Sequence, residues 1–165
     1  MRHALVFAAL ALFPAAAWAA ATPPKALGTF RHWTAATYDD GGQTVCYAFS
    51  EAVKSSPAVA KRGKVLLSVT ERPGSRDEVA LTAGYPYPAK ASVTLSVGQS
   101  HFDLYTASDA AFARDGAAAV RAFELGVTAQ TLGPAADGKG KITDDFSLDG
   151  FTAAYKAILK ACPGK

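Results

Sequence analysis

The sequence predicts a mainly β protein, an antiparallel sandwich or barrel with a short helical insertion and a C-terminal amphipathic helix. Three observations predict this class. Short runs alternate apolar and polar residues, and turn-forming Gly, Pro and Asp separate them. Apolar residues near the C-terminus recur at helical spacing. The length of 165 residues, 50% of them hydrophobic and 19% charged, suits one domain and excludes a disordered chain.

The first residues have the features of an export signal. A short basic start is followed by an apolar stretch over residues 4–13 and by small residues up to Ala21. We expect residues 1–21 to be a cleaved signal peptide, with an uncleaved membrane anchor as the alternative. The apolar stretch is shorter than the ~20 residues that a bilayer requires, and Pro14 interrupts it. We therefore expect a periplasmic, secreted or surface-associated protein with no transmembrane segment after cleavage.

The rest of the chain divides into a lead-in and one domain. Residues 22–29 contain two prolines and are expected to be flexible, and residues 30–165 form the domain. A turn at 39–42 joins the first two strands in a hairpin, and a polar connection covers 51–63. Strands are expected at residues 30–38, 44–50, 64–71, 78–84, 92–97, 101–105, 127–132 and 141–148.

Two regions favour helix. Residues 109–125 are rich in alanine and predict one or two short helices interrupted near Gly116. The closing helix presents an apolar stripe, and Asp149 or Ser147 is expected to cap its first turn. The stripe consists of Phe151, Tyr155, Ile158, Leu159 and Cys162.

Cys46 and Cys162 are the only cysteines, and an oxidising compartment favours a disulfide between them. Closing a loop of this length contributes up to roughly 4–5 kcal/mol on the chain-entropy model. Because Cys46 lies on a predicted strand and Cys162 on the closing helix, the bridge would pin that helix to the sheet. Two buried free thiols are the alternative.

His101 and Asp103 lie two residues apart on a predicted strand and therefore share a face, with Tyr105 next along it. Such a pair can orient a general base or bind a metal. The same face is the polar side of a hairpin, where these residues are ordinarily solvated. His32 precedes Trp33, so it points away from the core if Trp33 is buried.

Motifs of known catalytic sites are absent from the sequence, which has no G-x-S-x-G, H-E-x-x-H or P-loop. The pair Asp39–Asp40 suits a turn, and Asp144–Asp145 starts a strand. A calcium site is the alternative at either pair, although neither has the alternating oxygen ligands of an EF-hand. We therefore expect no catalytic residue, no cofactor and no metal.

Two surface segments are candidates for contact with a partner. The basic run over residues 61–64 is expected to be a solvated loop, with an anionic surface as its alternative partner. Tyr85, Pro86, Tyr87 and Pro88 form a segment of rigid aromatic and proline side chains that, if exposed, would suit a protein contact. The alternative is a loop that packs back over the sheet.

The order of these features resembles the invasion-associated locus B family of exported bacterial proteins. The resemblance includes Trp33 on an early strand, Cys46–Tyr47 on the next, and the stretch from Glu78 to Tyr85. Its most specific part is the close of the chain, from Asp145 to Phe151 and on to Cys162. The resemblance implies an immunoglobulin-like β-sandwich and a link to host-cell invasion in some pathogens, without an established reaction.

We therefore expect a non-enzymatic binding protein whose partner is a protein or a cell-envelope component. The net charge of +3 is too small to predict binding to nucleic acid. One alternative is a small periplasmic enzyme or metal protein that uses His101 and Asp103. Another is a carrier that holds an apolar ligand in a cavity of about 300 Å³ or more between the sheets.

Overall fold

The computed structural model describes residues 23–164, so the predicted signal peptide lies outside the described residues. Within them the chain forms eleven strands and two helices. In chain order these are β1 (Lys25–Phe30), β2 (Trp33–Asp40), β3 (Gln43–Glu51), β4 (Lys54–Ser56), β5 (Leu66–Arg72), β6 (Ser75–Thr82), β7 (Ser92–Val97), β8 (Ser100–Ala107), β9 (Ala110–Ala113), α1 (Gly116–Leu125), β10 (Thr128–Pro134), β11 (Lys141–Ser147) and α2 (Phe151–Ala161).

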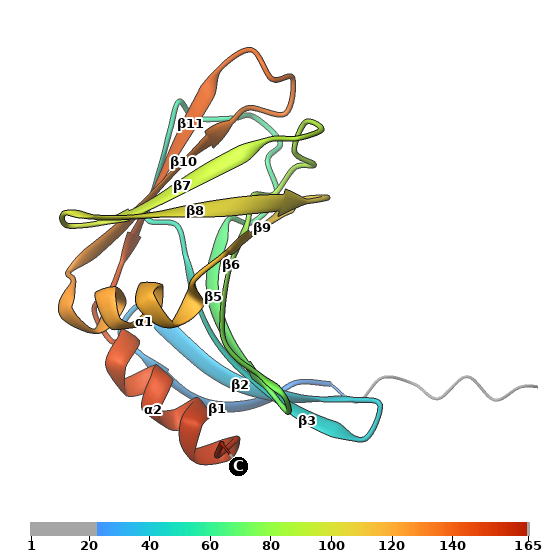
Figure 1. Cartoon of the computed structure of the whole chain (residues 1–165), viewed down its shortest axis with the longest axis vertical. Coiled ribbons are helices and arrows are strands. Elements are labelled where there is room, and N and C mark those ends of the chain that lie inside the picture. Colours follow the sequence, from blue (N-terminus) through green and yellow to red (C-terminus); the bar gives the residue numbers. More distant parts are fainter. Residues whose placement is uncertain (1–22, 165) are drawn as a thin grey trace, which may run out of the picture.

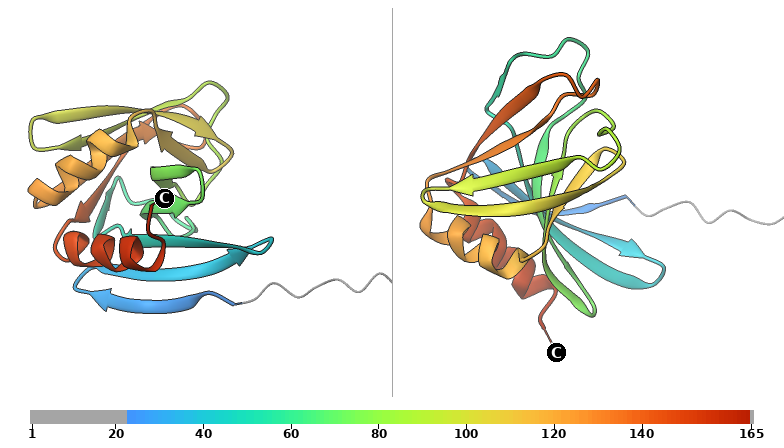
Figure 2. Two further views of the ribbon diagram at one scale, coloured as in Figure 1. Left: turned by 60° about the horizontal axis from the view of Figure 1, so that its bottom comes forward. Right: turned by 45° about the horizontal axis from the view of Figure 1, so that its top comes forward.

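The strands form one antiparallel sheet in the order β1-β2-β3-β5-β6-β9-β8-β7-β10-β11-β4. The sheet bends, so that β1 to β3 form one layer and β7, β8, β10 and β11 form another (Figures 1 and 2). β5, β6 and β9 connect the two layers. The predicted mainly β, sandwich-like fold with a C-terminal helix and a short helical insertion is confirmed. Its two layers are halves of one continuous sheet.

The core lies on the inner face of the bent sheet, which the helices close from one side (Figure 2). Trp33 is fully buried at its centre, and its ring packs 4.8 Å from Phe151 and 6.3 Å from Phe123, centroid to centroid. The indole Nε1 donates a hydrogen bond of 2.9 Å to the carbonyl of Ser147. Trp33 therefore joins β2 to both helices and to the end of β11, and burying each large apolar side chain contributes about 1.5–3 kcal/mol.

The N-terminal prediction was wrong at one point. Most of the expected flexible lead-in belongs to β1, which pairs with β2 from Lys25 to Phe30. The turn between them falls at Arg31 and His32, so the expected strand over residues 30–38 begins at Trp33. The local composition predicted too little structure here, because the backbone pairing with β2 orders a segment whose own side chains are mostly small or exposed.

The alanine-rich segment over residues 109–125 is only partly helical. Its first part is β9, which pairs with β6 on one side and β8 on the other. The helix α1 begins at Gly116, after Asp115 caps it by accepting a 2.9 Å hydrogen bond from the Ala118 amide. Alanine favours helix in isolation, but pairing with two neighbouring strands overrides that propensity for residues 110–113.

The closing helix α2 is where the sequence predicts it, but its cap is different. Neither Asp149 nor Ser147 caps it, and Gly150 occupies the capping position with a φ of 94°. A Cβ on Gly150 would clash with the carbonyl of Phe30, so the close approach of the β1–β2 turn explains the glycine. The predicted disulfide joins Cys46 to Cys162, with 6.0 Å between the Cα atoms, and attaches the end of α2 to β3.

Candidate binding face

The outer face of the sheet, opposite the core, carries a row of side chains that crosses six neighbouring strands. Directly paired residues of adjacent strands share a face, so the register identifies the members of the row. The row consists of Thr34, Phe49, Ser68, Ala80, Phe112 and Tyr105, on β2, β3, β5, β6, β9 and β8. Five strand spacings make it roughly 24 Å long, measured along the sheet.

Aromatic rings gather at both ends of this row. On β2 and β3, Tyr47 stacks on Phe49 at 5.8 Å and meets Tyr38 edge-on at 5.7 Å. On β8 and β9, Tyr105 stacks on Phe112 at 5.6 Å. We call the first group, Tyr38, Tyr47 and Phe49, the lower cluster, and the second, Tyr105 and Phe112, the upper cluster. All five rings are at least partly accessible to solvent, and Tyr105 is 45% exposed.

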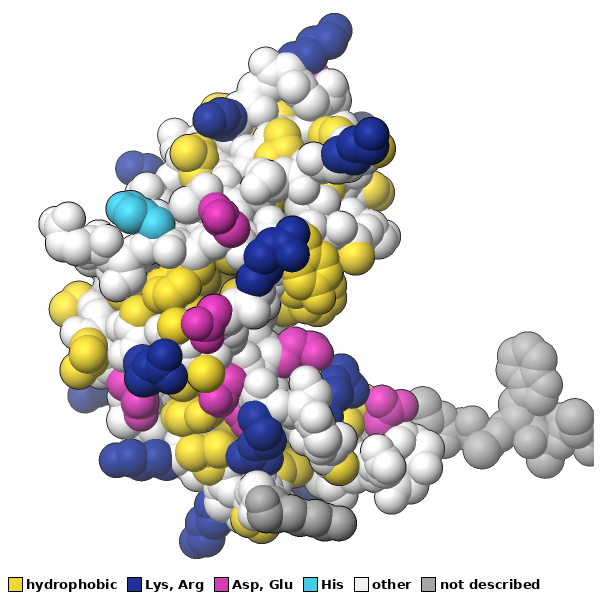
Figure 3. Space-filling view, in the orientation of Figure 1, with side chains coloured by type: hydrophobic (Ala, Val, Ile, Leu, Met, Phe, Trp, Pro, Cys, Tyr) yellow, Lys and Arg dark blue, Asp and Glu magenta, His cyan; other side chains and the backbone are white. Residues whose placement is uncertain are grey.

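Between the clusters the row contains only small side chains. Ser68 and Ala80 lie between Phe49 and Phe112, and Ser68 donates a 3.3 Å hydrogen bond to the carbonyl of Ala80. Three strand spacings separate the two clusters by roughly 14 Å. The space-filling view shows the molecule indented on this side, with an apolar group and a basic side chain above the indentation (Figure 3). We call the surface that runs from the lower cluster across Ser68 and Ala80 to the upper cluster the hollow.

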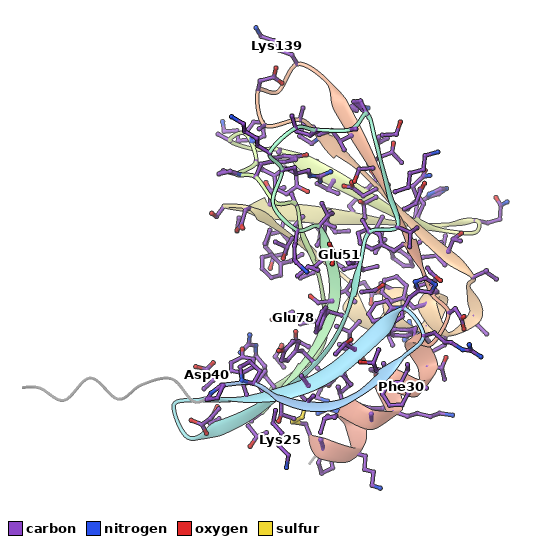
Figure 4. All side chains as sticks on the ribbon, turned by 180° about the vertical axis from the view of Figure 1, so that it is seen from behind. Lys25, Phe30, Asp40, Glu51, Glu78 and Lys139 are labelled. Atoms are coloured by element: carbon purple, nitrogen blue, oxygen red, sulfur yellow. A yellow bond between two sulfur atoms is a disulfide. The ribbon has the colours of Figure 1, made fainter. Side chains whose placement is uncertain are left out.

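The charges around the hollow are balanced. Arg72 contacts Asp40 at 3.2 Å and Glu78 at 3.9 Å on the lower side. Figure 4 labels Asp40 at the end of the β2–β3 hairpin and Glu78 on β6. The Arg114 guanidinium lies 5.4 Å from the centre of the Tyr105 ring, within reach of a cation–π contact. Arg72 with its two carboxylates therefore borders the aromatic surface on the lower side, and Arg114 borders it on the upper side.

The phenol of Tyr47 stays protonated at neutral pH. Burial raises its pKa above the ordinary value of a tyrosine, and the neighbouring Tyr38 raises it further. A neutral phenol can both donate and accept a hydrogen bond. The lower cluster therefore offers uncharged hydrogen-bonding groups beside its ring faces.

Within residues 23–164, His101 and Asp103 are not joined by a third His, Cys, Asp or Glu side chain that could complete a metal site. Both side chains are exposed on the face of β8 that also carries Tyr105, and Asp103 lies beside Tyr105 and Arg114. The Nδ1 of His101 shares a 2.9 Å hydrogen bond with the hydroxyl of Ser96 on β7. His32 is exposed at the β1–β2 turn, so the two histidines lie on different parts of the molecule.

The segment from Tyr85 to Pro88 packs back over the end of the sheet. Tyr85 donates a 2.9 Å hydrogen bond to the carbonyl of Pro134, and Tyr87 packs against the core. Burial, the largest cause, raises the pKa of both phenols. Pro86 is exposed and the other three residues are partly buried, so the segment packs back over the sheet, and its contact with a partner stays a prediction.

The basic run over residues 61–64 is not simply a solvated loop. The guanidinium of Arg62 forms a bidentate pair with Asp144, with N–O distances of 2.7 and 2.8 Å, and both side chains are almost fully buried. Ser55 donates a 2.6 Å hydrogen bond to the same carboxylate, and Arg62 lies 4.8 Å from the centre of the Tyr85 ring. This network attaches the loop that follows β4 to the strand β11.

The acidic pairs have structural partners. Asp39 accepts a 2.9 Å hydrogen bond from the Gly42 amide, as the turn prediction requires. Asp145 accepts one of 2.8 Å from Gln130, and Asp144 is paired with Arg62. Among residues 23–164 no group of three or more His, Cys, Asp or Glu side chains converges as metal ligands would.

A second polar cluster lies beside the disulfide, where the β5–β6 turn meets α2. Glu71 is fully buried and forms an ion pair with the Nε of Arg76 at 2.5 Å. Burial, with a hydrogen bond to Asp77, raises the pKa of Glu71 to about 7, against the opposing effect of Arg76. Tyr155 of α2 donates to Asp77, and Arg76 donates to the carbonyl of Cys162 at 2.8 Å. These contacts clamp α2 onto the sheet.

The space between the two halves of the sheet is occupied by side chains. Trp33, Phe123, Phe146, Phe151 and Ile158 are all buried there with at most 1% of their surface exposed. The pockets described in residues 23–164 open at the surface, for example one of about 560 Å³ beside Arg76 and Cys162. This arrangement gives the carrier hypothesis no support.

Reasoning from sequence missed the hollow, although its rings were visible. Tyr47 and Phe49 alternate with Cys46 and Ala48, which is the signal of a strand with one aromatic outer face. The link from Phe49 to Phe112 depends on the strand order, in which β9 lies between β6 and β8. That order has no local signature in the sequence.

A family model described as "Invasion associated locus B (IalB) protein" matches residues 33–159. The match begins at Trp33 and covers every strand that contributes to the hollow. No curated protein and no solved structure matches the chain. In residues 23–164 neither helix is long enough to span a bilayer.

Proposed function

Because the chain belongs to the invasion-associated locus B family, we propose that it is an exported, non-enzymatic domain that binds a protein or cell-envelope component. The partner is bound by the hollow on the outer face of the sheet. The observation that carries the proposal is the row from Phe49 to Tyr105, which places two aromatic clusters on one open surface. Tyrosine and arginine are enriched where proteins recognise partners.

The disulfide and the family support an extracytoplasmic location. The side chains that could have served a reaction do not converge: His101 is paired with Ser96, and Asp144 is engaged by Arg62. The hollow, by contrast, has accessible rings and balanced charges. These features favour recognition over catalysis, and over nucleic acid, which requires a basic groove.

Site-specific photo-crosslinking tests the proposal. A photoreactive phenylalanine analogue replaces Tyr105 in the hollow, Pro86 in the packed loop, or His101 as an exposed control on the same strand as Tyr105. We expect one crosslinked species from envelope material that forms at Tyr105 and not at His101. Crosslinking only at Pro86 would contradict the hollow as the binding surface, and crosslinking at none of the positions would contradict the binding function.

A further inference from the structure

The spacing and chemistry of the hollow specify a class of ligand. The two aromatic clusters lie roughly 14 Å apart, with Ser68 and Ala80 between them. A ligand that contacts both clusters must be extended, and it must be thin enough to lie over the sheet face without a deep pocket. A compact ligand would contact only one cluster.

An extended peptide has little to gain in the hollow. Peptides add to sheets mainly by pairing their backbone with an open edge strand. The strands beneath the hollow are interior members of the sheet, since β3, β5, β6 and β9 each pair with a neighbour on both sides. Their backbone donors and acceptors are used within the sheet, so the side chains must provide the recognition.

The mixed charges beside the hollow disfavour polymers of one charge sign. Arg72 is engaged by Asp40 and Glu78, and Arg114 lies over the Tyr105 ring. An anionic chain would meet these two carboxylates, and a cationic chain would meet the two guanidinium groups. The surface is complementary to a ligand without net charge that offers many hydroxyl groups.

We propose that the hollow binds an uncharged polysaccharide chain, with one sugar ring on each aromatic cluster. Sugar rings present C–H groups that are attracted to the electron-rich faces of Tyr and Phe. Their hydroxyls match the two partly accessible polar groups beside the rings of the lower cluster, namely the Glu78 carboxylate and the Tyr47 phenol. Thr70 pairs with both Tyr47 and Glu78 across the strands, so these groups lie together beside the lower cluster.

This inference rests on the proposed function and narrows its partner to an envelope glycan. The test uses two uncharged probes, chitohexaose and cellohexaose, and a charged probe, hexagalacturonate. Each is titrated into the isotope-labelled, disulfide-bonded protein while amide chemical shifts are recorded by NMR. We expect saturable shifts from at least one uncharged probe, confined to the amides of β2, β3, β5, β6, β9 and β8.

Variants separate binding from folding. Phe49→Ser and Phe112→Ser each remove one stacking surface, and we expect each to weaken binding about tenfold. Leu132→Ser is the matched control, because Leu132 is 38% exposed on β10, outside the hollow. It should bind the probe as the unchanged protein does.

Three outcomes would overturn the sugar assignment. One is the absence of shifts from both uncharged probes, and another is equal or tighter binding of hexagalacturonate. The third is binding that Phe49→Ser and Phe112→Ser leave unchanged. If the uncharged probes fail while Tyr105 crosslinks a protein, the sugar assignment is wrong and the proposed binding function stands. If both experiments fail, both proposals are wrong.

Discussion

Alternating residues of β3 form its two faces, and these faces differ in burial and in their contacts. Cys46 and Ala48 face inward, are fully buried and hold the disulfide and the core contacts. Tyr47 and Phe49 face outward and remain partly accessible. The same contrast continues through β5 and β6, where Val69 and Val79 are buried beside the outward-facing Ser68 and Ala80.

This comparison shows how a small domain can keep stability and recognition apart. Side chains on the inner face have native partners all round, so replacing them costs folding free energy. The accessible side chains of the outer face, such as Tyr105, lack native partners on one side, and that side is available to a ligand. Substitutions should therefore divide into two classes according to the face from which they come.

The largest effect is expected at the centre of the inner face. Trp33→Ala removes a fully buried ring and its contacts with Phe123 and Phe151, and should lower the free energy of unfolding by about 3–5 kcal/mol. Denaturant unfolding followed by far-UV circular dichroism measures this change. A loss below about 1 kcal/mol would contradict the central role given to Trp33.

Removing the disulfide should have the next largest effect. The double variant Cys46→Ala with Cys162→Ala frees the end of α2 from β3, and should cost about 2–5 kcal/mol of unfolding free energy. Thermal unfolding of the variant and of the unchanged protein, with and without reductant, measures it. Reductant should lower the unfolding temperature of the unchanged protein alone. An equal decrease in both proteins would rule out the disulfide as its cause.

The buried Glu71 should make stability depend on pH. Its pKa is about 7 in the folded protein, above the ordinary glutamate value of 4.5, so folded chains hold a proton that unfolded chains have released between these values. The unfolding free energy should therefore fall as pH rises through this range. Glu71→Gln should remove that fall, and urea unfolding at about pH 5 and about pH 8 measures it.

Glu78→Gln is the control for this pH effect, because Glu78 lies on the outer face, next to Arg72. It should keep the same decline in stability between the two pH values. If Glu71→Gln retained the full decline as well, Glu71 would not be the group responsible.

The smallest effect on folding is expected on the outer face. Tyr105 is 45% exposed, so Tyr105→Ser should change the unfolding free energy by less than about 1 kcal/mol. Differential scanning calorimetry measures this change. A loss as large as that of Trp33→Ala would mean that the upper cluster belongs to the core, and the distinction between the two faces would fail.

Local patterns in the sequence predict much of this fold. The alternation over residues 92–105 corresponds to the β7–β8 hairpin, and the helical spacing from Phe151 onward corresponds to α2. The two cysteines led to the correct bridge because no other pairing was available. These features depend on residues close in sequence, or on a residue type that occurs only twice.

The features that sequence reasoning missed depend on contacts between distant residues. In the sequence Arg62 belongs to a basic run that predicts a solvated loop. Its partner Asp144 lies on β11, 82 residues further along the chain. The alanine-rich sequence of β9 predicts helix, because nothing in the local sequence indicates its two partner strands, β6 and β8. The hollow needs the complete strand order, so its rings could be noticed in the sequence but not joined into a site.

The most direct test of the account is to measure capture of envelope material by the double variant Phe49→Ser with Tyr105→Ser, alongside the unchanged protein. The variant removes one ring from each aromatic cluster and leaves the inner face intact. We predict that it folds, with its disulfide formed, and captures no partner. A folded double variant that captures its partner as well as the unchanged protein does would contradict the assignment of recognition to the outer face.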